Sequence, residues 1–119
     1  MREKILERLA RGEIIENYRE LGNSMTPIIK HREPVTLAPV ETSKLEKGDI
    51  VFAKVHGNFF THFVGGVEGE RIKIQNNHGH VNGWITGASV YAIVIAVNGV
   101  PRRGALEKTL KFSARGVVK

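Results

Sequence analysis

The chain has 119 residues, a length that is usual for one domain and enough to bury a single modest core. It contains no cysteine, which excludes disulfide bonds, a thiolate nucleophile and a cysteine-ligated zinc site. The formal net charge is +6, and the six basic residues minus one acidic residue from Arg102 onward account for +5 of it, so the basicity is local and does not indicate a surface that wraps nucleic acid.

The N-terminal residues predict a short amphipathic helix. Aliphatic residues recur at helical spacing over residues 3–11, charges occupy the other face, and Gly12 is typical of a helix stop. We expect this helix to pack on the body of the domain. These residues contain no uninterrupted apolar stretch, so we expect neither a secretion signal nor a hydrophobic anchor, and we expect a soluble, cytoplasmic protein.

From Pro34 onward the pattern favours β-strands. Turn residues separate runs of β-branched and aromatic residues, of which the last, residues 90–97, lies in an apolar stretch about half as long as the ~20 residues of a membrane-spanning helix. The clearest hairpin covers residues 49–64, with His56-Gly57-Asn58 as a three-residue connection. We also expect a strand near residues 18–21 and a short helix that begins at Thr26-Pro27.

Strands that follow one another through short turns favour antiparallel pairing, because parallel pairing needs long crossover connections. The predicted fold class is therefore mostly β, an antiparallel, partly closed barrel or coiled sheet, with a short N-terminal helix and a short helix after Ser24. We expect one domain over residues 1–100, followed by a basic C-terminal tail over residues 101–119. This tail is either a solvated segment or, through residues 102–119, a contact for an anionic partner.

Two residues are candidates for chemistry. Ser24 lies in the sequence GNSMTP (residues 22–27), where glycine allows close backbone approach and a following helix would offer unpaired amide donors. His62 lies in a predicted strand, on the same face as Phe60 and Val64. Each has an ordinary alternative, a capping serine and a packed histidine. A serine nucleophile needs a neighbouring base, which an imidazole can supply if the fold brings the two together.

The sequence GNSMTP resembles the G-x-S-M-x-P box around the nucleophile of signal peptidases and LexA-type self-cleaving proteins. Residues 48–55 and 61–64 resemble the strand and hairpin that deliver the general base in that superfamily, and the resemblance covers residues 18–97. It implies a fold of the LexA C-terminal or signal-peptidase type, Ser24 as nucleophile, and His62 as base, as in the histidine-base variant. Asn23 and Met25 would support the oxyanion site. Lys54, the competing base on the hairpin, precedes the turn and is interpreted as a solvated lysine.

A third similarity concerns the residue that would orient the base. Residues 74–77 (IQNN) resemble the G-D-N-N box of signal peptidases, but Ile74 and Gln75 replace the glycine and the aspartate. The acid that orients the base in the family therefore has no counterpart here. His80 or Asn82 can take this role through a hydrogen bond; the alternative is that both are ordinary loop residues.

The resemblance implies a serine endopeptidase with a Ser-His dyad, without a cofactor, acting on an extended peptide that binds as an added strand. Two alternatives stay open: a catalytically inactive binding or structural module with the peptidase fold, for example a phage or mobile-element accessory protein, and nucleic-acid binding through the basic tail. Self-cleavage of the LexA kind is not expected, because Ala10-Arg11-Gly12 does not match the Ala-Gly bond that it needs.

Metal and phosphate sites have little support in the sequence. His56, His62, His78 and His80 lie within one stretch, but a His-x-His pair on a loop rich in glycine and asparagine has no diagnostic zinc spacing. We therefore expect no metal site. No glycine-rich phosphate loop or dinucleotide fingerprint occurs.

Overall fold

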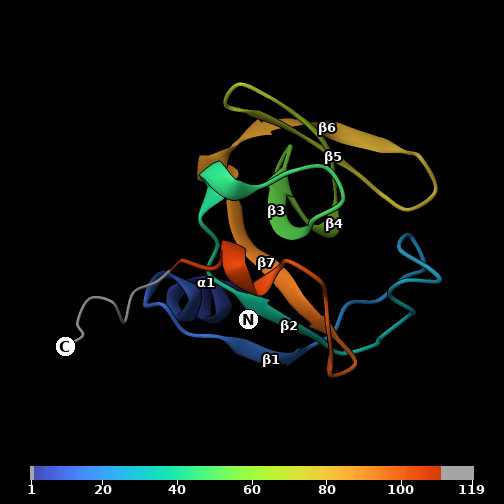
Figure 1. The fold of residues 1–119 in the computed structure, drawn as a ribbon. Helices are drawn as coiled ribbons and strands as arrows, with labels where there is room; N and C mark the ends of the chain where they lie inside the picture. The colour runs from blue at the N-terminus through green and yellow to red at the C-terminus, as the bar shows by residue number, and fades with distance from the viewer. Residues whose placement is uncertain (1, 111–119) are drawn as a thin grey trace.

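Eight strands form one antiparallel sheet in the computed structural model, which describes residues 2–110 (Figure 1). A helix precedes them, α1 (Arg2–Ala10). The strands are β1 (Ile15–Tyr18), β2 (Val35–Ala38), β3 (Ile50–Val55), β4 (Asn58–Glu68), β5 (Arg71–Gln75), β6 (Val81–Thr86), β7 (Val90–Val97) and β8 (Val100–Pro101). Three single-turn 3-10 helices are η1 (Thr42–Lys44), η2 (Gly87–Ser89) and η3 (Leu106–Lys108).

The strands are ordered β1-β2-β7-β3-β4-β5-β6, and β8 pairs with β7 outside this path. All the described pairs are antiparallel. The predicted mostly β, antiparallel class is thus confirmed. The end strands β1 and β6 do not pair with each other, so the sheet described by residues 2–110 is not closed.

Central strand β3 is buried on both faces over its apolar residues 50–53, while Lys54 is exposed. Alternate residues of β3 enter two separate hydrophobic clusters: Val51 and Val55 belong to one, and Ile50 and Phe52 belong to the other. The second cluster also contains Leu9 of α1, so the predicted helix exists and packs on the sheet as expected. No helix within residues 2–110 has the length and apolar character needed to cross a membrane.

The β3–β4 hairpin confirms the predicted pairing but has a shorter turn. Val55 pairs with Asn58, so the connection consists of His56 and Gly57 alone. Both residues have positive φ, 50° and 84°, as a two-residue turn of the mirror-image type requires. Asn58 therefore begins β4 and is not part of the connection. The resulting register places His62 opposite Val51.

The predicted strand at residues 18–21 is wrong in position, because β1 ends at Tyr18. Ile15 is buried and pairs with Leu37, whereas Leu21 is 74% exposed, so burial favours the earlier residues as the strand. Strand β6 was not predicted at all. Its Asn82-Gly83 dipeptide is typical of a turn, but the residues on either side pair with β5.

The short helix predicted after Ser24 is also absent, and residues 24–28 form turns instead. The Thr26 hydroxyl donates to the carbonyl oxygen of Asn23, and no backbone amide within residues 2–110 donates to it as in a helix cap. The carbonyl oxygens of Ser24 and Thr26 accept hydrogen bonds from Asn77. These carbonyls thus bond to a distant segment and not to the amides of a following helical turn.

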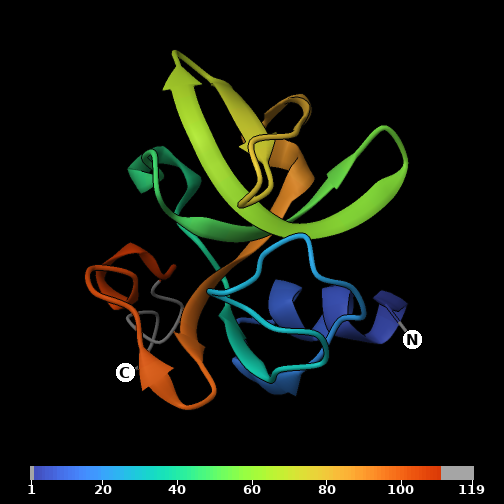
Figure 2. The ribbon, with the colours of Figure 1, turned by 90° about the vertical axis from the view of Figure 1, so that its right-hand side faces the viewer.

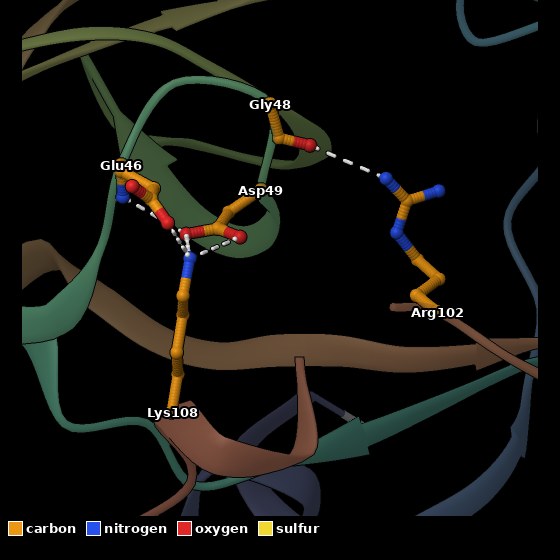
Figure 3. A network of polar contacts seen from close by, with 5 residues as sticks. All are labelled: Glu46, Gly48, Asp49, Arg102 and Lys108. Atoms are coloured by element: carbon orange, nitrogen blue, oxygen red, sulfur yellow. Dashed lines mark hydrogen bonds and ion pairs between the residues drawn. The ribbon is translucent and has the colours of Figure 1, made fainter. Parts of the chain in front are cut away.

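Part of the predicted C-terminal tail packs on the domain (Figure 3). The ammonium group of Lys108 lies 2.8 and 2.9 Å from the carboxylate oxygens of Asp49 and 2.9 Å from Glu46, and the Arg102 guanidinium donates to the Gly48 carbonyl at 3.2 Å. Ala105 is only 3% exposed and belongs to the core. Residues 101–110 thus differ from the solvated tail expected of them, and residues 111–119 lie outside the described part.

Candidate active site

Ser24 lies in the long connection between β1 and β2, residues 19–34, which passes beside the long strand β4 (Figure 2). The turn between β5 and β6 holds this connection in place. The backbone amide of Asn77 donates to the Ser24 carbonyl at 3.0 Å, and its side-chain amide donates to the Thr26 carbonyl at 2.7 Å. Nε2 of His78 donates to the Asn23 carbonyl at 3.0 Å. Two segments about 50 residues apart therefore fix the backbone on both sides of the serine.

His62 lies in β4 and is 6% exposed. Its ring stacks on that of Phe60, with centroids 4.8 Å apart, on the same side of the sheet as the buried Val64. This is the face that strand alternation predicts. Nε2 of His62 lies 2.9 Å from Oγ of Ser24, so the fold brings the two candidate residues into a direct hydrogen bond across 38 positions of sequence.

Asn82 completes the arrangement. Its Oδ1 lies 2.7 Å from Nδ1 of His62 and accepts the proton of that nitrogen. The Nδ1–H tautomer leaves the Nε2 lone pair to accept the Ser24 hydroxyl proton. Ser24, His62 and Asn82 thus form one continuous chain of hydrogen bonds.

A β-bulge places Asn82 in this position. Ile74 of β5 pairs with Gly83, and the next residue, Gln75, pairs with Val81. Asn82 is therefore the extra residue of β6 at this point of the ladder. Bulges re-aim side chains next to functional sites, and here the bulge accompanies the hydrogen bond between Asn82 and the histidine.

His80, the other candidate for the orienting role, does not contact the imidazole in this way. It is exposed, and its influence on His62 is electrostatic. Of the two residues that sequence reasoning left open, the structure brings only Asn82 to Nδ1. The amide oxygen of Asn82 is therefore the acceptor at this nitrogen.

The pKa of His62 lies below the ordinary value of 6.5. Burial is the main cause, because it disfavours the charged imidazolium, and the nearby His80 lowers the pKa further. The hydrogen bond to Asn82 and the negative charge of Glu20 act in the opposite direction without overcoming burial. The imidazole is consequently neutral at pH 7, the form that can accept a proton.

An open cleft of about 1070 Å³ exposes this chain of hydrogen bonds. Its wall contains Ser24, His62 and Asn82. A small pocket beside Ser24 adjoins the same region and is lined by Met25, Ile29 and residues from the end of β1. A substrate could therefore reach the serine hydroxyl.

Asn23 and Met25, the residues predicted to support the oxyanion site, take part in local hydrogen bonding and packing. The Asn23 carbonyl accepts from Thr26 and His78, and the side chain of Met25 is buried in the hydrophobic cluster under α1. The backbone amides of Ser24 and Met25 donate no hydrogen bond within residues 2–110. Lys54, the competing base, is exposed and lies over the Phe59 ring at 5.5 Å.

Glu20 is a charged residue of the cleft that sequence reasoning missed. The hydroxyl groups of Tyr18 and Thr61 both donate to its Oε2, at 2.8 and 2.9 Å. Thr61 is the neighbour of His62 in β4, so the carboxylate sits close to the histidine strand. No motif in the sequence links residue 20 to residue 61, and only the folded chain reveals this contact.

Among residues 2–110, no three histidine, aspartate or glutamate side chains are grouped so that they could hold a metal ion. Comparisons of the chain with protein-family models, with curated proteins and with solved structures each found no match.

Proposed function

We propose that this chain is a serine endopeptidase of the signal-peptidase/LexA-like kind in its histidine-base variant. Ser24 is the nucleophile, His62 is the general base, and Asn82 orients the base. The observation that carries the proposal is the 2.9 Å contact between Ser24 Oγ and His62 Nε2, with the Nδ1 of the same imidazole held at 2.7 Å by Asn82. Nucleophile, base and orienting group in this order are the arrangement that activates a serine at neutral pH.

The geometry suggests how each step proceeds. Oγ of Ser24 attacks the peptide carbonyl carbon while its proton passes to Nε2 of His62. The resulting imidazolium gives this proton to the leaving amine, and the acyl group stays on Ser24. A water molecule, deprotonated by the same nitrogen, then attacks the acyl carbon and releases the serine. Throughout, Asn82 keeps the ring in the tautomer that accepts at Nε2.

The negative charge that develops on the carbonyl oxygen needs hydrogen-bond donors. The amides of Ser24 and Met25, which have no acceptor within the described residues, are suited to this role. Their position is fixed because Asn77 and His78 hold the neighbouring carbonyl groups. The site would thus require little rearrangement during the reaction.

The test uses a fluorophosphonate probe, which reacts with activated serines, together with a peptide-library substrate. We expect wild type to be labelled and to hydrolyse peptides, Ser24→Ala to lose both, and His62→Ala to lose most of both. The matched control is Ser43→Ala, because Ser43 is exposed and its hydroxyl, among the residues that the structure describes, hydrogen-bonds to Glu41 alone. Equal signals from wild type, Ser24→Ala and His62→Ala would contradict the proposal.

One feature favours the rival function, a peptidase-like module that binds peptides without cleaving them. Asn82 is neutral, so it stabilises an imidazolium less than a carboxylate does. The same experiment separates the two functions: the rival requires that peptide binds in the cleft of wild type while neither labelling nor hydrolysis occurs.

A further inference from the structure

The cleft beside Ser24 contains a carboxylate for which the reaction has no use. Glu20 lines both the open cleft and the small pocket next to the serine. Its charge reaches the site, since it raises the pKa of His62 against the effect of burial. Glu20 does not touch the serine or the histidine through a hydrogen bond, so its role lies outside proton transfer.

The hydrogen bonds of Glu20 orient its carboxylate asymmetrically. Tyr18 and Thr61 both donate to Oε2. Oε1 has no partner within residues 2–110, although a carboxylate oxygen can accept two hydrogen bonds. Two hydroxyl groups thus fix the carboxylate and leave one oxygen available to a ligand.

The neighbouring charged residues do not neutralise Glu20. Arg19 also lines the cleft, but its guanidinium donates to the carbonyl oxygen of Arg32 at 2.7 Å. In the small pocket, the Glu33 carboxylate accepts from the backbone amide of Lys30, and the Lys30 ammonium forms no ion pair with another residue of the range 2–110. Within the described part of the chain, Glu20 therefore has no cationic partner of its own.

The open cleft gives a long basic side chain both space and apolar surface beside Glu20. Tyr18, Leu21 and Phe60 line this cleft together with Glu20. Lysine and arginine lay their aliphatic stems along apolar surface and keep the charged end at a polar group. A cation at Oε1 would form a charge-assisted hydrogen bond, the stronger class of these bonds.

We propose that Glu20 is a specificity-determining residue that binds the cationic end of a lysine or arginine side chain, placed near the scissile bond of the peptide substrate. This inference rests on the proposed peptidase function. It assigns the substrate a chemical class, a peptide with a basic residue close to the bond that is cut.

The experiment uses a library of N-acetylated, C-amidated hexapeptides in which each position in turn carries lysine, arginine, norleucine or glutamate. Norleucine has the lysine stem without its charge. For wild type we expect kcat/KM at one position to be about ten- to a hundredfold higher with lysine or arginine than with norleucine. Glu20→Gln should reduce this ratio to near one. Loss of the Glu20 charge also lowers the pKa of His62. This change affects the lysine and norleucine peptides alike, so it cancels in the ratio of their kcat/KM values.

Glu33→Gln is the matched control, since it removes a carboxylate from the small pocket that Glu20 also lines. A preference for the basic peptides that survives in Glu20→Gln, or that Glu33→Gln removes to the same extent, would overturn the assignment. So would a wild type that cuts lysine and norleucine peptides equally. A second library with free N-termini separates a basic side chain from a terminal ammonium group, and dependence on the free terminus alone would also contradict the proposal.

Binding to Ser24→Ala keeps this inference separate from the proposed function. Fluorescently labelled members of the same library are titrated with Ser24→Ala and with the double variant Ser24→Ala/Glu20→Gln. Tighter binding of lysine than of norleucine peptides, lost in the double variant, supports the role of Glu20 even if wild type hydrolyses nothing. Hydrolysis by wild type without any such selectivity in binding or in kcat/KM would leave the peptidase function standing and refute the role of Glu20.

Discussion

The side-chain oxygen of Asn82 lies 2.7 Å from Nδ1 of His62 because a bulge in β6 adds one residue between the Gly83–Ile74 and Val81–Gln75 pairs. The contact sets the tautomer of the imidazole and therefore which nitrogen faces Ser24. The acceptor in this contact is the neutral amide oxygen of Asn82.

Replacing Asn82 should damage the proposed reaction without removing the nucleophile. In Asn82→Ala the imidazole loses its acceptor at Nδ1, so the productive tautomer and ring orientation are no longer enforced. We expect kcat to fall by about 10²- to 10⁴-fold, the range seen when the orienting group of a triad is disabled. Steady-state kinetics on a cleaved peptide provides the measurement. Asn82→Asp, which keeps an acceptor, should retain more activity than Asn82→Ala, and the reverse order would contradict the role of Asn82.

The pH profile should report the lowered pKa of His62. The base must be neutral to act, so kcat/KM should rise with pH and reach half its plateau below 6.5. In Asn82→Asp the added negative charge favours the imidazolium, so the rising limb should move to higher pH; in Glu20→Gln it should move to lower pH. A wild-type midpoint above 6.5 would contradict the expected effect of burial.

The lowered pKa of His62 should also make the free energy of unfolding depend on pH. The unfolded chain takes up a proton on His62 near pH 6.5, whereas the folded chain does so only at lower pH. The contribution of His62 to the free energy of unfolding should therefore decline as the pH falls from 6.5 to the pKa of His62 in the folded chain. Below that pKa the contribution should stay constant. Urea unfolding of wild type and of His62→Gln at several pH values measures the difference.

Asn77 should affect reactivity through the position of Ser24. Asn77→Ala removes the hydrogen bond to the Thr26 carbonyl but keeps the backbone bond to Ser24. We expect slower fluorophosphonate labelling and a loss of about 1 kcal/mol in the free energy of unfolding. Asn58→Ala, a change of an exposed asparagine in the β3–β4 hairpin, serves as control. Labelling of Asn77→Ala at the wild-type rate would show that the hydrogen bond from the Asn77 side chain to the Thr26 carbonyl does not position the serine.

The ion pair between Lys108 and Asp49 should stabilise the fold. The two side chains are 13% and 12% exposed, so Lys108→Met removes the cation bonded to a largely buried carboxylate, which keeps the amide of Glu46 as a donor, and should cost about 2 kcal/mol. Burial lowers the pKa of Lys108, but the hydrogen bonds and charges of Asp49 and Glu46 outweigh it and raise the pKa overall. The stabilisation should therefore be complete below pH 10.5 and be lost as the pH rises through the folded pKa.

A double-mutant cycle with Asp49→Asn isolates the Lys108–Asp49 pair, with the free energy of unfolding measured in urea. Additive effects of Lys108→Met and Asp49→Asn would show that the two side chains do not stabilise each other.

The strongly patterned elements could be predicted from sequence. The amphipathic N-terminal helix, the β3–β4 hairpin and the apolar strand β7 follow from local periodicity and turn residues, which act over a few neighbouring positions. The motif around Ser24 and the strand position of His62 pointed to the pair that the structure joins. The predicted helix after Ser24 is wrong: the carbonyl groups of Ser24 and Thr26 bond to the distant Asn77, a contact that local residues do not reveal.

The amino-acid sequence by itself determined the β-rich character of this protein, the face of the strand that carries His62, and the two residues proposed for chemistry, because side-chain alternation and local motifs are encoded in adjacent positions. Only the tertiary structure decided that Asn82 and not His80 reaches the imidazole, that Glu20 lies in the same cleft, and that Ala105 enters the core. These contacts depend on a strand bulge and on pairings between segments far apart in the chain, which no local pattern specifies.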